Sequence, residues 1–235
     1  MKRIGFSGWR YPALALLSLL CMGAAPEKPG GHLEPESRVW NVDRYWDYTS
    51  VVRWVFREVF GDDVVLWMHF SPSMGSHEEG FVALKSNPAQ ILVVHTDVPL
   101  FLYSERGRQG GTGFGKMSPA DYHNVLPVRC EAAIPPNLGG RIAGAWRRVL
   151  LQTRYDETPR RGMDGEYFSF WQRVNDLRVL SGWVWSPEDD SNPGILIRVA
   201  FGMQDYCAAQ DAAHLKALSS MVGLLEYHLK ADEAP

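Results

Sequence analysis

The residues that come nearest to a known chemistry by type and spacing lie in the stretch GGTGFGKMS, residues 110–118. Gly110, Gly115 and Lys116 stand at the spacing of the phosphate-binding loop G-x-x-x-x-G-K-[ST]. Met117 occupies the position at which a serine or threonine hydroxyl would bind Mg²⁺. The motif is therefore incomplete, and we expect this loop to bind neither a nucleotide nor another cofactor.

A better use of this glycine-rich segment is contact with another protein. Its glycines leave the backbone free to adopt many conformations, which is typical of a solvated loop. The candidate contact residues are Arg106, Arg108, Phe114 and Lys116. If the loop has a role, these side chains favour a partner-contact loop over a phosphate site.

His77, Glu78 and Glu79 form a second group with acid–base chemistry. The group begins like the metalloprotease motif H-E-x-x-H, but Phe81 stands where the second histidine would be. We therefore predict no metal site here. The three side chains could supply a general acid or base, although a polar turn between two strands accounts for them without a function. We assign no catalytic residue from sequence.

The N-terminal segment indicates export. Lys2 and Arg3 precede an apolar run over residues 13–25, which is shorter than the roughly 20 residues of a membrane-spanning helix. We interpret residues 1–25 as a signal peptide and expect a periplasmic or secreted protein without a transmembrane segment after cleavage. In an alternative, Cys21 is the attachment site of a lipoprotein, but Leu20 stands where a small residue is expected.

Charge and cysteine content limit the partners and the compartment. Without residues 1–25 the chain keeps 21 of its 24 basic residues and all 27 acidic ones, a net charge of −6. This acidic balance excludes nucleic acid as a favoured partner. Cys130 and Cys207 are the two cysteines after the signal peptide, and in an oxidising compartment they predict one disulfide. Two free thiols remain the alternative.

Residues 26–38 are rich in Pro, Gly and Glu and lack apolar periodicity, which predicts a flexible leader. The apolar periodicity that follows predicts a single α+β domain over residues 39–230. Short turn-rich connections between the predicted strands favour antiparallel pairing, and so a mainly antiparallel sheet with packed helices. The predicted strands cover 64–70, 80–86, 90–96, 100–105, a segment around Cys130, and a hairpin over 166–187; the predicted helices cover 43–60, 135–155, 194–207 and 209–229.

The hairpin and the following helix permit a finer prediction. Alternation places Trp183 and Trp185 on one face of a strand and Val184 on the other. We expect at least one of the two tryptophans to be buried beneath the next helix. Asn192 is predicted as the N-cap of that helix, with Pro193 at its first position.

Three stretches, WRRVLLQTRY (146–155), DGEYFSF (164–170) and GWVWSP (182–187), resemble a group of uncharacterised exported proteins of Gram-negative bacteria. The resemblance implies an envelope location and a core built from a hairpin and a helix. It implies no catalytic residue.

These features together favour a non-catalytic protein-binding module of the cell envelope, such as an inhibitor or immunity protein that blocks a secreted antibacterial effector. The alternative is an envelope hydrolase whose dispersed histidine and carboxylate residues meet only in the folded chain. Groups that converge in a deep pocket would favour the enzyme, whereas a broad exposed patch would favour the binding module.

Overall fold

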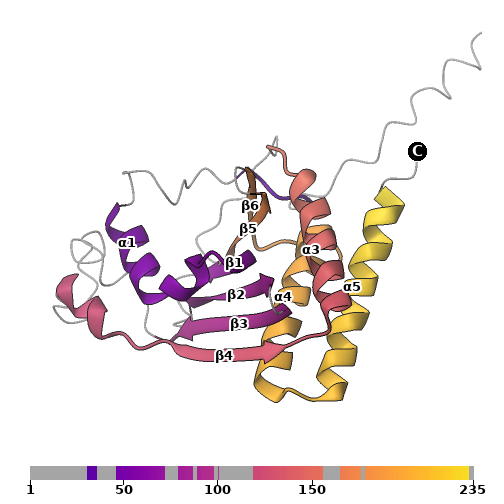
Figure 1. The fold of residues 1–235 in the computed structure, drawn as a ribbon. Helices are drawn as coiled ribbons and strands as arrows, with labels where there is room; N and C mark the ends of the chain where they lie inside the picture. Colours follow the sequence, from indigo (N-terminus) through magenta and orange to yellow (C-terminus); the bar gives the residue numbers. More distant parts are fainter. Residues whose placement is uncertain are drawn as a thin grey trace, which may run out of the picture.

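The protein folds around a six-stranded sheet in the order β4-β3-β2-β1-β5-β6, in which every neighbouring pair is antiparallel (Figure 1). The computed structural model describes residues 31–35, 46–71, 79–86, 89–97, 100, 119–155, 165–175 and 178–232. The strands are β1 (Val64–Ser71), β2 (Glu79–Ser86), β3 (Ala89–Thr96), β4 (Val128–Ala133), β5 (Tyr167–Asn175) and β6 (Arg178–Trp185). The predicted α+β class with a mainly antiparallel sheet is confirmed. Of the strand predicted over 100–105, only Leu100 is described, and it lies in a 3-10 turn.

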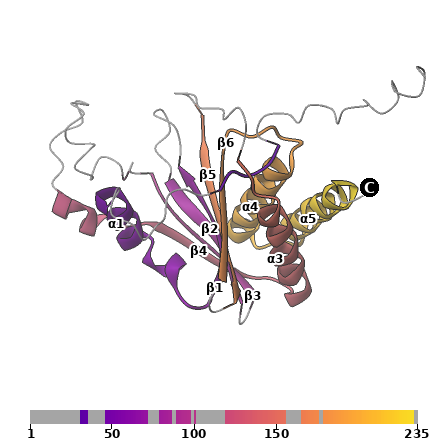
Figure 2. The same ribbon diagram turned by 90° about the horizontal axis from the view of Figure 1, so that it is seen from above.

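Helices cover both faces of the sheet, as the view along the sheet shows (Figure 2). One face carries α1 and the short turns near it, and the other carries α3, α4 and α5. The bounds are α1 (Trp46–Val55), η2 (Arg57–Phe60), η4 (Pro119–Asn124), α3 (Pro136–Leu151), α4 (Asn192–Ala209) and α5 (Ala212–Asp232).

The larger core lies between the sheet and the three long helices. Trp146 of α3 is fully buried there, with its ring 5.5 Å from that of Phe170 in β5. The predicted apolar stripe of α5 is also buried, as the 0% exposure of Leu218 and Leu225 shows. α3 and α5 each bury one stripe at helical spacing, whereas the first six residues of α4 are all buried, so α4 is the central helix of this layer.

The smaller core lies between the sheet and α1. Phe56 is fully buried, with its ring 5.1 Å from that of Phe81 in β2. The predicted helix over 43–60 ends early, because Phe56 leaves the helical conformation (φ −104°, ψ 28°) and the chain continues as η2. This turn carries Val59 into the same core and brings the ring of Phe60 to 5.5 Å from Phe81.

Residues 31–35, here called the strap, belong to the folded domain. Leu33 has 0% exposure and packs in the larger core. Glu34 forms an antiparallel bridge with Trp183, with two backbone hydrogen bonds of 2.8 Å, and the Leu33 carbonyl accepts from the Arg154 amide at 2.9 Å. These five residues therefore differ from the flexible leader predicted over 26–38, whose other residues lie outside the described part of the chain.

The predicted burial of a tryptophan beneath α4 is wrong. Trp183 pairs with Ser169, which pairs with His69, so all three side chains share the sheet face that carries α1. Both Trp183 and Trp185 are half-buried, and Val184 packs in the core on the α4 side. The alternation was predicted correctly, but the face was reversed because both faces of this hairpin carry large apolar side chains.

Cys130 and Cys207 form the predicted disulfide, which joins β4 to α4 with a Cα–Cα distance of 6.0 Å. It connects an edge strand of the sheet to the helical layer. No helix within the described ranges is long and apolar enough to cross a membrane.

Removing the disulfide should destabilise the fold. The double variant Cys130→Ala, Cys207→Ala releases a chain segment 77 residues long. On the chain-entropy model this should lower the free energy of unfolding by about 4 kcal/mol, measured by urea unfolding. A reducing agent should lower the Tm of the wild type but leave that of the double variant unchanged. An equal response of the two proteins would contradict the prediction.

A second prediction concerns the ion pair between α3 and α5. Arg141 contacts Glu226 through two hydrogen bonds of 3.1 and 2.7 Å, which lower the pKa of the Glu226 carboxyl. A carboxyl with a lowered folded-state pKa stabilises the fold above its unfolded pKa, and the contribution is lost as the pH falls through the folded value.

Urea unfolding of wild type and Glu226→Gln tests this. Because both side chains are about one-third exposed (38% and 30%), the difference in unfolding free energy near pH 7 should be under about 1 kcal/mol. It should disappear as the pH falls below the ordinary glutamate pKa. A difference that is constant with pH would refute the electrostatic origin.

Candidate functional site

A buried polar cluster connects α1 to the sheet. The Tyr48 hydroxyl donates a hydrogen bond to Glu79 Oε1, and His69 Nε2 lies 2.9 Å from the same oxygen. His69 has 0% and Glu79 3% exposure, and the ring of Phe81 stacks on His69 with a centroid distance of 4.6 Å. His69 and Glu79 are closed to solvent and Tyr48 is partly buried, so the cluster forms a polar bridge between α1, β1 and β2.

The cluster changes the interpretation of Glu79. A solvated turn does not account for this residue, because it begins β2 and is buried. His77 and Glu78 lie outside the described residues. Sequence reasoning missed Tyr48 and His69, because 31 residues separate Tyr48 from Glu79 and only strand pairing brings His69 beside it.

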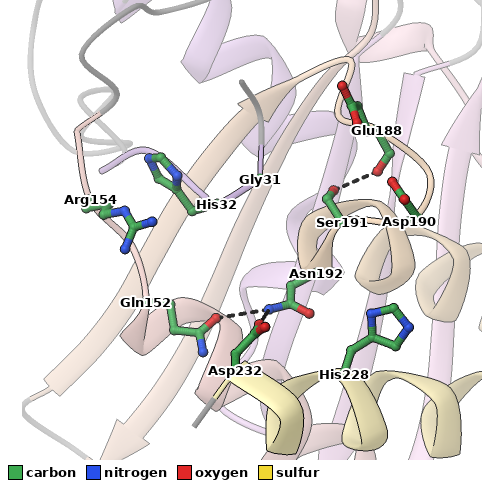
Figure 3. Close-up of a pocket in the computed structure, with 10 residues that line it drawn as sticks. All are labelled: Gly31, His32, Gln152, Arg154, Glu188, Asp190, Ser191, Asn192, His228 and Asp232. Carbon is green, nitrogen blue, oxygen red and sulfur yellow. Dashed lines mark hydrogen bonds between the residues drawn. The ribbon is translucent and has the colours of Figure 1, made fainter. Parts of the chain in front are cut away.

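A polar pocket of about 550 Å³ lies on the opposite side of the sheet (Figure 3). Four segments supply its walls: the strap, the C-terminal end of α3, the turn between β6 and α4, and the last turn of α5. These segments span most of the chain, from Gly31 to Asp232. The sequence carries no local signal for such a site, which exists only after folding.

Asn192 organises the floor of the pocket. Its side-chain amide donates to Gln152 Oε1 at 3.2 Å and to Asp232 Oδ2 at 2.6 Å. The residue is 8% exposed. It therefore joins the ends of α3 and α5 to the beginning of α4.

Ser191, rather than the predicted Asn192, is the N-cap of α4. Its hydroxyl accepts from the Gly194 amide at 3.1 Å and donates to the Glu188 carbonyl at 2.6 Å. Ser191 has extended backbone angles, whereas Asn192 is already in the helix and directs its side chain to other helices. Because both hydrogen-bonding functions of the Ser191 hydroxyl are engaged, it lacks the environment of an activated nucleophile.

Charged groups of both signs line the pocket. Glu188, Asp190 and Asp232 contribute carboxylates, and Arg154 contributes a guanidinium. The imidazoles of His32 and His228 complete the set. Among the residues that the structure describes, no three His, Cys, Asp or Glu side chains are arranged to hold a metal ion.

The second accessible feature is an aromatic surface on α1 and η4, here called the α1–η4 surface: Trp54, Arg57, Tyr122 and His123. Trp54 is 46% exposed, and its ring lies 4.5 Å from that of His123 and 6.5 Å from that of Tyr122. The Arg57 guanidinium lies 5.7 Å from the Trp54 ring centre. Leu126, which follows η4 along the chain, is 89% exposed.

The predicted partner loop with Arg106, Arg108, Phe114 and Lys116 lies outside the described residues, as does the incomplete phosphate-loop motif. Leu100 and η4 are the described parts of the chain on either side of this loop. Leu100 is fully buried in the core beneath α1, and η4 packs on α1. Both described neighbours of this segment therefore lie on the side of the sheet that carries α1.

Comparisons of the chain with protein-family models, curated proteins and solved structures found no match. Within the described part of the chain, the polar pocket and the α1–η4 surface are the two accessible features that could bind a partner or ligand.

The buried cluster yields a prediction about stability. Glu79→Ala removes the carboxylate that joins His69 and Tyr48, so it should lower the free energy of unfolding by roughly 3 kcal/mol. Tyr48→Phe removes one hydrogen bond and should cost about 1 kcal/mol.

Glu166→Ala provides the matched control, because Glu166 is exposed, and its effect should stay within about 0.5 kcal/mol. Urea unfolding of the three variants measures these differences. Equal unfolding free energies of Glu79→Ala and Glu166→Ala would contradict the prediction that the cluster stabilises the contact of α1 with the sheet.

Proposed function

We propose that this protein is a non-catalytic protein-binding module of the cell envelope and that its contact surface is the α1–η4 surface. The observation that carries the proposal is the half-exposed Trp54, held between His123 and Arg57. Tryptophan, tyrosine and arginine are the residues most enriched among those that dominate protein interfaces. Three of the four residues of this surface belong to that group.

The packing around Trp54 favours binding because the side chain is already ordered. Contacts with Tyr122 and His123 restrict its ring, so less conformational entropy remains to be lost on association. The Arg57 guanidinium bonds to the Trp54 carbonyl at 3.3 Å and makes no ion pair within the described ranges. It is therefore available to a carboxylate of a partner.

The neighbouring loop can enlarge this surface. Residues 101–118 carry Arg106, Arg108, Phe114 and Lys116, and their described neighbours, Leu100 and η4, lie on the face of the sheet that carries α1. Basic and aromatic residues thus occur on both parts. A protein partner with acidic groups around an apolar site would complement them.

Export supports an envelope partner. The disulfide between Cys130 and Cys207 is of the kind that persists in an oxidising compartment, and the N-terminal segment has the pattern of a signal peptide. An inhibitor or immunity protein that blocks a secreted antibacterial effector needs a tight contact surface and no chemistry of its own. This is the form of the proposal that we favour.

The alternative of an envelope hydrolase has its best location in the polar pocket. There the Ser191 hydroxyl is engaged in capping α4, and His228 makes no hydrogen bond to another described residue. A nucleophile paired with a base is therefore missing from this group. The geometry favours the binding module.

Trp54→Ala tests the proposal. The tagged full chain, expressed with its own N-terminal segment and recovered from the periplasm, is used to isolate a partner, whose affinity for each variant is then measured by calorimetry. Loss of a central aromatic contact typically costs about 2 kcal/mol, so Trp54→Ala should weaken binding about 30-fold. Urea unfolding should show that the variant is nearly as stable as wild type, because Trp54 is half-exposed.

Tyr227→Ala is the matched control, because Tyr227 is a 70% exposed aromatic residue on α5, on the other side of the sheet. It should bind like wild type. Equal affinities of the Trp54 and Tyr227 variants would show that the α1–η4 surface is not the contact surface.

A further inference from the structure

We propose that the outer face of α5 pairs two copies of this chain in an antiparallel contact with two-fold symmetry. The outer face of α5 is the name used here for five exposed residues at helical spacing: Ala213, Ala217, Ser220, Leu224 and Tyr227. The inference goes beyond the proposed function and does not depend on it, because α5 and the α1–η4 surface lie on opposite sides of the sheet (Figure 2).

The position of α5 in the helical layer leads to the inference. Figure 2 shows α5 beyond α3 and α4, farthest from the sheet. It packs on both of these helices and buries one apolar stripe, Leu218, Val222, Leu225 and Leu229. A surface helix of this kind typically carries charged and polar residues on the side opposite its apolar stripe.

The outer face of α5 differs from this expectation. The exposed residues between Lys216 and Lys230 are Ala217, Ser220, Leu224 and Tyr227. Leu224 is 40% and Tyr227 is 70% exposed. Glu226, the acidic residue of this part of the helix, is bound to Arg141 of α3. Exposed leucine and tyrosine without charged neighbours are typical of the core of a protein interface.

Ser220 does not make the centre of this face polar. Its hydroxyl donates a hydrogen bond to the Lys216 carbonyl of the same helix at 3.0 Å. The donor is therefore already engaged, and a second helix can approach at this small residue. A contact centred here loses no hydrogen bond between the protein and water from the hydroxyl donor.

The order of side-chain sizes along the face identifies a second copy as the occupant. The first half carries the small residues Ala213 and Ala217, and the second half carries Leu224 and Tyr227. When two copies of α5 pair antiparallel about a two-fold axis near Ser220, the first half of each helix faces the second half of the other. Leu224 then lies against Ala217, and Tyr227 against Ala213, so each large side chain meets a small one.

The charges at the two ends of α5 match the same arrangement. Asp211 precedes the helix with a side chain that is 51% exposed, and the His214 backbone N–H donates to it at 2.8 Å and lowers the pKa of its carboxyl. Lys230 lies exposed in the last turn. An antiparallel pair places Asp211 of each copy at the level of Lys230 of the other. A parallel pair would instead place each lysine beside its own counterpart, so charge complementarity favours the antiparallel pair.

This contact leaves the other candidate surface free. The α1–η4 surface lies on the far side of the sheet in each copy, away from α5. The dimer would therefore present two such surfaces and would be bivalent for a partner that binds there.

Analytical ultracentrifugation of the chain recovered from the periplasm tests the inference. Wild type should be mainly dimeric at about 100 μM and should dissociate on dilution. Leu224→Arg places a charge inside the contact and should weaken the dimer at least about 10-fold. Val179→Arg is the matched control, because Val179 is a 55% exposed aliphatic residue on β6, and it should dimerise like wild type.

Three results would overturn the inference or keep it open to test. Wild type that is monomeric at this concentration would overturn it and leave the face to a partner of another kind. Equal dimerisation of wild type and Leu224→Arg would place the contact elsewhere and would also overturn it. If urea unfolding shows that Leu224→Arg is not folded, Tyr227→Ala takes its place, since it only truncates an exposed ring.

Cysteine cross-linking tests the orientation of the two helices. In the antiparallel pair the two copies of residue 220 face each other, whereas the two copies of residue 213 lie about 20 Å apart along the helix. A disulfide needs a Cα–Cα distance under about 7 Å. Cys130 and Cys207 are already joined, so an added cysteine has only its counterpart to react with. Ser220→Cys should form a covalent dimer on non-reducing electrophoresis, and Ala213→Cys should not. Equal yields would contradict the antiparallel arrangement.

Two further measurements separate this inference from the proposed function. Trp54→Ala should dimerise like wild type, and Leu224→Arg should keep the wild-type affinity of each chain for a partner of the α1–η4 surface. A loss of dimerisation in Trp54→Ala would show that the contact does not lie on α5 alone and would overturn the inference.

Discussion

Burial of both faces of β1 and β2 is the constraint on which the rest of the structure depends. Nearly every residue of these two central strands is buried, so each strand needs a covering layer on both sides. Three long helices cover one face, whereas among the described residues the other is covered by α1, of 10 residues, and the short turns near it. A helix this short would be marginal alone, and its contacts with the sheet must hold it in place.

The two layers meet this constraint by different means. The helical layer of α3, α4 and α5 buries mainly aliphatic side chains, while α1 combines aromatic packing around Phe81 with the polar bridge of Tyr48, Glu79 and His69. A buried polar bridge contributes little net free energy when intact, but a broken one leaves an unsatisfied group in the core. It therefore specifies where α1 lies on the sheet more than it adds to stability.

The elements that could be predicted from sequence are those with a local signal. The hairpin of β5 and β6 and the stripe of α5 follow from alternation and helical spacing, and the disulfide follows from two cysteines in an exported chain. Leu33 could not be predicted, because one apolar residue in a Pro- and Gly-rich stretch has no periodicity. The predicted direction of the Trp183 side chain was wrong for another reason. Alternation defines two faces of a strand, but only tertiary packing determines which face the long helices cover.

The two candidate sites also differ in whether a local sequence pattern predicts them. Trp54 lies off the stripe of Val51, Val52 and Val55 on α1, so its exposure was within reach of helical periodicity. The pocket was not, because its walls come from residues as far apart as His32 and Asp232.

The strap explains how such distant residues form one pocket. Leu33 packs so closely on β6 that a Cβ added at Gly182 would lie 3.0 Å from the Leu33 Cβ and 3.1 Å from Thr153 Oγ1. Glycine at 182 therefore permits the contact that holds the strap between β6 and the end of α3. His32 precedes Leu33 and Arg154 follows Thr153, so this one apolar contact brings both to the same side of the pocket.

The rigid sheet between the strap and α1 gives the two candidate sites separate supports. Side chains far apart and without shared partners contribute to stability nearly additively, so a change at Trp54 should not reach the pocket. The α1–η4 surface on one face and the polar pocket on the other can thus be changed independently within one small domain.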